Sequence, residues 1–223
     1  MLHGTGWLQT TASVLNGGIK IAMLLDSAQP VLTHCSDGWD RTSQIVSLAM
    51  IILDPFYRTI NGFAVLVEKE WIAFGHNFAL RSGHGVLANE SVSPIFLIFI
   101  ECVWQLTRQC PTAFEFNEEF LVMVMDELYA CRFGTFLANN ERESYELRLR
   151  ERTVSLWTEV DSRREEFLNP FFEEEHKALR VSASMRAMML WERYYLRWAS
   201  EANMSASPLV AAAHKLTEGR LKT

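Results

Sequence analysis

The sequence predicts an α/β fold in which helices far outnumber strands and the central sheet is incomplete. Apolar residues recur at helical spacing through most of the 223-residue chain. Only the run from Val31 to Cys35, which follows Pro30, has the β-prone composition of a strand. A strand that is apolar on consecutive positions needs neighbouring strands and helices on both faces. Because the chain offers few such neighbours, the predicted sheet lacks partners.

Two predicted helices flank this strand. Residues 7–25 carry apolar positions close to helical spacing, although Gly17-Gly18 weakens the middle of the helix. After Arg41, a wide apolar stripe predicts a buried helix that Asp54-Pro55 ends, because proline disfavours α geometry in the residue before it. The local order is therefore strand, short loop and helix.

The middle of the chain predicts three further helices. The first covers Gly62 to Phe78. The second opens at Ser93-Pro94, with serine as the N-cap and proline at the first helical position, and closes at Cys110 before a proline. The third covers 117–136, with Asn117 as its N-cap and acidic residues in its first turn.

The last third of the chain is less regular. Residues 139–152 are almost entirely polar, which predicts a solvated loop or an exposed helix. Residues 153–168 form another segment, and the aromatic side chains of 184–198 are expected to pack on the domain. We therefore expect one partial domain over residues 1–200 and a frayed tail over 201–223.

Composition excludes several classes of protein. The formal net charge of −6 and the lack of Lys/Arg-rich runs argue against nucleic acid as a partner. The four cysteines form no C-x-x-C pair and follow no signal peptide, so we expect free thiols and a cytoplasmic location. The longest apolar runs fall short of the roughly 20 residues that cross a bilayer. We therefore expect no membrane span.

The loop between the predicted strand and helix carries the chemistry. Cys35 and Arg41 stand six positions apart, with Gly38 between them. Such a loop turns backbone N–H groups inward at the positive end of the following helix, which favours a tetrahedral anion such as phosphate. The helix and Arg41 are expected to lower the pKa of the thiol, so that Cys35 attacks phosphorus and forms a cysteinyl phosphate. The planar fork of Arg41 suits two phosphoryl oxygens.

A proton for the leaving oxygen requires a carboxyl group in this loop. Asp37 and Asp40 are the two candidates, and we favour Asp40. For either aspartate, a structural role in accepting loop N–H bonds stays open, as does a buried apolar thiol for Cys35. His34 is expected to hold the loop by hydrogen bonding.

No metal or cofactor is expected. His76, His84, Cys102 and Cys110 show no metal-ligand spacing.

The string His34-Cys-Ser-Asp-Gly-Trp-Asp-Arg-Thr42 resembles the active-site signature of the myotubularin family, inositol-lipid phosphatases of the protein-tyrosine-phosphatase superfamily. The resemblance extends over about residues 5 to 200. Other stretches that carry it are Leu53-Asp-Pro-Phe-Tyr-Arg-Thr59, Gly62-Phe63, Val65-Leu-Val-Glu-Lys-Glu-Trp71, Phe74-Gly-His76, Pro111-Thr-Ala-Phe-Glu-Phe-Asn117, Phe133-Gly-Thr-Phe136 and Thr153-Val-Ser-Leu-Trp157.

The resemblance implies a cysteine-phosphatase-like domain, of which this chain holds the helix-rich C-terminal portion. It implies removal of the 3-phosphate from phosphatidylinositol 3-phosphate and the 3,5-bisphosphate, without a metal, at endosomal membranes that the protein contacts peripherally. It also implies Cys35 as the nucleophile, Arg41 as the phosphate binder and Asp40 as the acid. Ser36, Asp37, Gly38 and Trp39 are then expected to contact the substrate.

Two departures from the family pattern bear on function. Close members carry a pair of basic residues suited to a 5-phosphate, whereas this chain has Asn77 and keeps only Arg81. Both are expected at the substrate, and use of the bisphosphate stays open. The family's domain also extends well upstream, so a non-catalytic regulatory or scaffold protein and a protein-tyrosine phosphatase remain alternatives. Homo- or hetero-oligomers with family members are further expected partners.

Overall fold

Helices make up the regular structure of this computed structural model, which describes residues 5–84, 91–174 and 177–198. Within these ranges there is no strand, apart from one isolated antiparallel bridge between Phe116 and Leu168. The α-helices are α2 (Trp7–Asp26), α3 (Arg41–Leu53), α4 (Ile60–Val67), α5 (Phe78–Ser82), α6 (Ile95–Gln109), α7 (Glu118–Ala130), α8 (Glu141–Glu146), α9 (Leu149–Arg152), α10 (Leu156–Ser162), α11 (Arg164–Phe167) and α12 (Glu192–Tyr195). The remaining helices are two 3₁₀ turns, η1 (Pro55–Arg58) and η3 (Gly134–Phe136), and the π-helix η2 (Glu68–Ala73).

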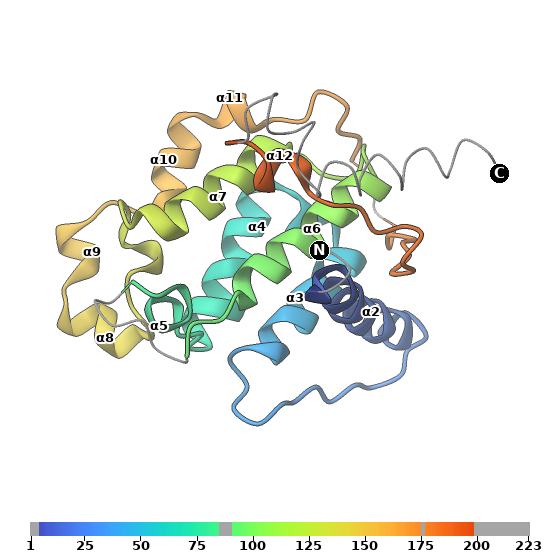
Figure 1. The fold of residues 1–223 in the computed structure, drawn as a ribbon, viewed down its shortest axis with the longest axis horizontal. Coiled ribbons are helices and arrows are strands. Elements are labelled where there is room, and N and C mark those ends of the chain that lie inside the picture. Colours follow the sequence, from blue (N-terminus) through green and yellow to red (C-terminus); the bar gives the residue numbers. More distant parts are fainter. Residues whose placement is uncertain (1–4, 85–90, 175–176, 199–223) are drawn as a thin grey trace.

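Helix α6 runs through the centre of the bundle, between α2 and α3 on one side and α7 on the other (Figure 1). It is buried on nearly all sides, which fits its apolar sequence. Its Phe99 ring stacks on Phe63 of α4, with ring centroids 6.1 Å apart. Phe63 in turn meets Phe116 and Phe120 edge to face. This aromatic cluster joins four segments into one core.

Helices α2 and α3 pack closely because of the two glycines in α2. A methyl group at Gly18 would lie 2.6 Å from Cβ of Leu48, and one at Gly17 would lie 2.9 Å from Ile45. The glycines cost helix stability, as the sequence predicts, but they allow the two helices to approach. The close packing anchors α3, whose first turn carries the candidate site.

The strand predicted over Val31 to Cys35 is wrong for the described residues. The chain from 27 to 40 projects from the body as an irregular loop between α2 and α3 (Figure 1). Leu32 is 90% exposed, and no described segment forms a hydrogen-bonded ladder with this run. A β-prone run becomes a strand only when another strand pairs with it. The described residues therefore contain no sheet, although the predicted α/β fold requires one. The prediction that helices dominate the chain is confirmed.

Several predicted helix boundaries also differ. The helix expected over 62–78 begins at Ile60, turns into the π-helix after Val67 and stops before Gly75, whose φ is +79°. Pro94, rather than the predicted Ser93, is the N-cap of α6, and no side chain caps that helix. Asn117 does cap α7 by accepting the Phe120 N–H, but α7 ends at Ala130 instead of 136.

The C-terminal part runs back over α6. Residues 139–152 form the short exposed helices α8 and α9, and 153–168 hold α10 and α11. Beyond them, Trp191 is fully buried and stacks on Trp104 of α6, with ring centroids 5.6 Å apart. Both indole N–H groups donate to the carboxylate of Glu118. Packing of this segment is confirmed, except that Trp198 is 87% exposed. The tail predicted over 201–223 lies outside the described residues.

Candidate active site

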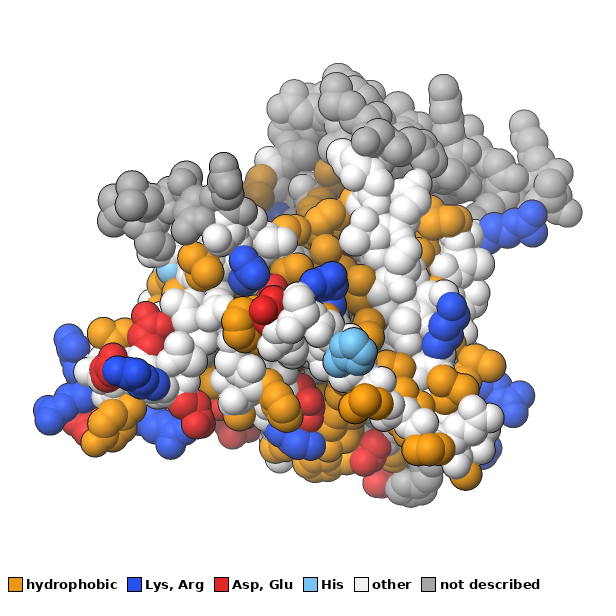
Figure 2. Space-filling model, turned by 90° about the horizontal axis from the view of Figure 1, so that it is seen from below, with side chains coloured by type: hydrophobic (Ala, Val, Ile, Leu, Met, Phe, Trp, Pro, Cys, Tyr) orange, Lys and Arg blue, Asp and Glu red, His pale blue; other side chains and the backbone are white. Residues whose placement is uncertain are grey.

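The candidate site is the loop from Cys35 to Asp40 together with the first turn of α3. Figure 2 views the molecule from the side on which this loop projects in Figure 1. The half-buried Cys35 thiol accepts a hydrogen bond from the Gly38 N–H at 3.2 Å. Gly38 has φ +92°, a conformation that other residues rarely adopt, so glycine permits this turn. The loop therefore curls around its own sulfur.

The pKa of Cys35 is lowered from 9.0 to about 7. The Thr42 side chain, at the start of α3, lowers it most. Burial opposes the shift, and the backbone N–H groups of Gly38, Asp37 and Thr42 add to it. Thr42 lies in the first turn of α3, so the positive end of that helix faces the sulfur. About half of the thiol is then ionised at pH 7, as a nucleophile requires.

Arg41 lies across the mouth of the loop. Its Nη2 donates to Ser36 Oγ at 3.2 Å, and Ser36 Oγ donates to the Asp37 carboxylate at 2.9 Å. All three side chains are exposed. His34 Nδ1 lies 3.4 Å from the Cys35 carbonyl oxygen, at the limit of hydrogen-bond distance. Loop residues 35–41 thus lie together, with a guanidinium available to an anion.

Asp40, the residue before α3, is held by two side chains from distant parts of the sequence. Arg81 of α5 donates to Asp40 Oδ2 through Nε at 3.0 Å and Nη2 at 2.8 Å. The buried ring of His76 places Nδ1 2.8 Å from Asp40 Oδ1. The same Nδ1 lies 3.1 Å from the Trp39 carbonyl oxygen. The predicted substrate-binding residue Arg81 is therefore bound to the predicted acid.

These contacts decide the charge of Asp40. Burial alone would raise its pKa, but the hydrogen bonds and charges of His76 and Arg81 outweigh that effect and lower it. In this geometry Asp40 is a carboxylate at neutral pH. A general acid must carry a proton, so an acid role for Asp40 requires that its surroundings change when a substrate binds.

Sequence reasoning missed two residues of this site. Thr42 follows directly after Arg41, and its place in the first helical turn was the signal for a hydroxyl near the thiol. His76 was considered only as a metal ligand, although it stands beside Asn77 in a stretch that carries the family resemblance. Asn77 itself is the N-cap position of α5, between His76 and Arg81 in sequence.

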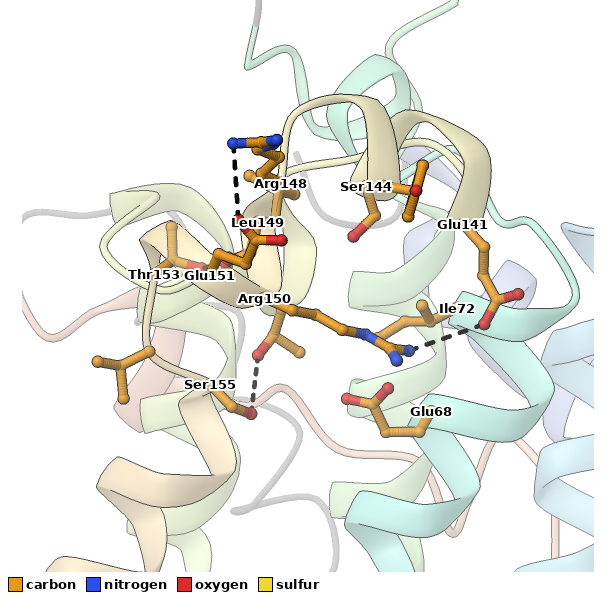
Figure 3. Close-up of a pocket in the computed structure, with 14 residues that line it drawn as sticks. Glu68, Ile72, Glu141, Ser144, Arg148, Leu149, Arg150, Glu151, Thr153 and Ser155 are labelled. Carbon is orange, nitrogen blue, oxygen red and sulfur yellow. Dashed lines mark hydrogen bonds and ion pairs between the residues drawn. The ribbon is translucent and has the colours of Figure 1, made fainter.

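A separate cavity of about 600 Å³ lies between the π-helix and the segment formed by α8, α9 and 153–155. Figure 3 shows Arg150 extending between Glu141 and Glu68, with 4.0 Å between Arg150 Nη2 and Glu141 Oε1. Its lining mixes both signs of charge. It includes none of the predicted site residues, so this cavity is distinct from the cysteine loop.

Comparison with known proteins assigns the family. A profile described as the myotubularin-like phosphatase domain matches residues 1–145, which include the whole cysteine loop and its partners on α5. The chain belongs to the myotubularin-like phosphatase family. A second profile, described as myotubularin-associated protein, matches residues 135–218. The resemblance drawn from the sequence is thereby confirmed.

Curated members of this family are highly similar to the chain. Myotubularin of Rattus norvegicus is 50% identical over 212 residues, covering 93% of this chain and 35% of the rat protein. Myotubularin of Xenopus tropicalis is 53% identical over 88% of this chain and 33% of its own length. The phosphatidylinositol-3,5-bisphosphate 3-phosphatase MTMR2 of Bos taurus is 54% identical over 83% of this chain and 29% of its own length. The chain spans about a third of the length of these relatives.

Among the described residues, no helix has the length and apolar character needed to cross a bilayer.

Proposed function

We propose that this chain carries the catalytic loop of a phosphoinositide 3-phosphatase that acts on phosphatidylinositol 3-phosphate. The observation that carries the proposal is the Cys35 thiol, whose pKa is lowered to about 7 at the start of α3, with Arg41 beside it. Membership of the phosphatase family supports this chemistry, and a relative's name specifies a 3-phosphatase of an inositol lipid.

In the proposed reaction, the Cys35 thiolate attacks phosphorus and the bond to the inositol oxygen breaks. Arg41 leaves Ser36 and binds two phosphoryl oxygens, while the N–H groups around the thiol bind the third. The inositol oxygen leaves with a proton from Asp40. Water then attacks the cysteinyl phosphate, Asp40 takes its proton, and inorganic phosphate departs as the thiolate is restored.

The role of Asp40 depends on substrate charge. In the free site, Asp40 is a carboxylate bound by Arg81. An incoming phosphate places a second negative charge beside Asp40, which raises the pKa of Asp40. The phosphate also attracts the guanidinium of Arg81 away from Asp40. The half-buried Arg81 is 22% exposed at its side chain, so it can reach a substrate. Asp40 would then be protonated only when substrate is present.

Arg81 and Asn77 also bear on substrate choice. A second phosphate on the inositol ring requires cations in addition to Arg41. The α5 region supplies Arg81, but the side chains before it at 77–80 and after it at 82 are neutral. We therefore propose the monophosphate as the preferred substrate and the 3,5-bisphosphate as the weaker one. Asp37 and Trp39, at the mouth of the loop, are proposed to contact the inositol ring.

A lipid substrate places this face against a membrane. Met23, Leu24, Leu25 and Leu32 are exposed apolar side chains at the end of α2 and in the projecting loop. We propose peripheral contact with endosomal membranes on their cytoplasmic side. The second matched profile, named for a myotubularin-associated protein, supports assembly with other family members.

Release of inorganic phosphate from short-chain phosphatidylinositol 3-phosphate tests the proposal. The wild-type chain is expected to release phosphate, and Cys35→Ser is expected to reduce release to background. Equal release by both proteins would end the proposal. The same assay with short-chain 3,5-bisphosphate and a phosphotyrosine peptide ranks the three substrates, and preference for the peptide would favour a tyrosine phosphatase.

One observation favours a non-catalytic role for the chain alone. Residues 31–35 lead into the nucleophile but have no strand partner among the described residues. The assay is therefore repeated after co-expression with the part of rat myotubularin that lies outside the matched segment. Activity only in the co-expressed sample would assign the chain as one part of a composite site, and activity in neither would favour a scaffold.

A further inference from the structure

His76 occupies an unusual place for a histidine. Its side chain is fully buried and sits between two aromatic rings, edge to face with Trp71 at 4.9 Å and with Phe78 at 4.7 Å between ring centroids. Its backbone N–H donates to the Trp71 carbonyl five residues earlier, so that it follows directly on the π-helix. π-Helical turns often mark functional positions. The local backbone thus fixes where this ring points.

The two nitrogens of the ring have opposite surroundings. Nδ1 lies 3.1 Å from the Trp39 carbonyl oxygen, its hydrogen-bond partner, and 2.8 Å from Asp40 Oδ1, with which it makes a close polar contact. Nε2 is buried and has no hydrogen-bond partner among the described residues. Because a carbonyl and a carboxylate only accept, Nδ1 must carry the hydrogen. The ring is thereby assigned as a donor to the loop.

Trp39 and Asp40 are the last two residues before α3. The Trp39 carbonyl also accepts from Ser43 Oγ at 3.2 Å, so the loop is tied both to its own helix and to the core. Arg81 reaches the same aspartate from α5, but it binds the other carboxylate oxygen and is more exposed than His76. The loop therefore has one partly exposed partner, Arg81, and one buried partner, His76.

We propose that His76 is a positioning residue of the anion-binding loop, whose Nδ1–H holds the Trp39 carbonyl and lies against the Asp40 carboxylate. With these two residues held, the N–H groups of Asp37, Gly38 and Thr42 stay directed at the Cys35 sulfur. This inference rests on the proposed function, because it assigns His76 to the same phosphate site. It adds a residue that makes no contact with the reacting atoms.

The test uses variants that separate the donor from the ring. His76→Phe keeps an aromatic ring between Trp71 and Phe78 but removes the donor. His76→Asn keeps an N–H donor near the Nδ1 position and loses the ring. Phe78→Leu is the matched control, because it weakens the packing of the same cluster and leaves the Nδ1 contacts intact. Circular dichroism and urea unfolding establish that each protein is folded.

Two measurements read the loop without relying on turnover. The first is the pH dependence of Cys35 alkylation by iodoacetamide, followed by mass spectrometry of the Cys35 peptide so that the other three cysteines do not interfere. The second is protection of Cys35 from alkylation by inorganic phosphate. The other titratable side chains of the loop and of α5, namely His34, Asp37, Asp40, Arg41 and Arg81, are the same in every variant.

His76→Phe is expected to raise the alkylation midpoint above that of the wild type and to require about five-fold more phosphate for protection, the fold-change that loss of one ordinary hydrogen bond produces. His76→Asn is expected to restore most of both properties. A His76→Phe protein with wild-type midpoint and protection would overturn the inference, as would equal effects of Phe78→Leu. If phosphate protects no variant, including the wild type, the proposed function fails, and the alkylation midpoints still decide the role of His76.

Discussion

Replacement of Thr42 by valine tests how the Cys35 thiol is ionised. Valine keeps the shape of threonine but removes the hydroxyl that lowers the pKa of Cys35 most. A hydrogen bond to a charged group contributes about 1.5 kcal/mol, which corresponds to a change of about one pH unit in a pKa. The pKa of the thiol is therefore expected to rise from about 7 to roughly 8. At pH 7 the thiolate fraction would fall from about a half to about a tenth.

Iodoacetamide alkylation of Cys35 between pH 5.5 and 9.5 measures this change. At pH 7, the variant is expected to react about five-fold more slowly, whereas at pH 9.5 the two rates are expected to converge. Thr33→Val makes the same substitution two residues before the cysteine and is expected to leave the profile unchanged. Identical profiles for wild type and Thr42→Val would refute the assignment and leave backbone N–H groups as the source of the lowered pKa.

Three further predictions concern packing and charge. Gly18→Ala is expected to lower the free energy of unfolding in urea by about 1–3 kcal/mol, because its methyl group would lie 2.6 Å from a carbon of α3. Asn16→Ala, on the exposed face of α2, is the control and is expected not to lower this free energy. Arg81→Gln is expected to raise the pKa of Asp40 in NMR titration, and an unchanged value would show that Arg81 does not hold the carboxylate. Since the folded pKa of Asp40 is lowered, the stability it contributes is present above its ordinary value of 3.8 and is lost below it. Burial raises the pKa of Glu101 above 4.5, so wild-type stability should fall as pH rises from 4.5 to 7 relative to Glu101→Gln; parallel curves would contradict this.

Local sequence signals predicted most of the helical structure. Asp54-Pro55 ends α3 and Asn117 begins α7 because each effect depends on the residue itself and its immediate neighbours. The strand at 31–35 could not be predicted in the same way, since a strand is formed by the segment that pairs with it. The end of α7 was also missed. Cys131, which follows the helix, adopts a φ of +55°, a conformation that its residue type does not favour and therefore does not signal.

In the candidate site, too, the local features could be predicted from the sequence and the long-range contacts could not. The spacing of Cys35 and Arg41 predicted that one loop holds both, and their proposed chemistry is tested by the assays above. The pairing of Asp40 with Arg81 and His76 was not readable, because α3 and α5 meet only through the tertiary packing of the bundle. The sequence predicted an acid at Asp40, which stays a prediction, but it gave no sign of the Arg81 and His76 contacts that lower the pKa of that carboxyl.

The carboxylate of Glu118 has a consequence for how the chain can be divided. It accepts from Trp104, within the first matched profile, and from Trp191, within the second. A truncation after residue 145 would uncover the face of Trp104 and leave this partly exposed acceptor without one of its donors. We therefore expect the two profile regions to unfold together, so that a protease cut between them releases no stable fragment.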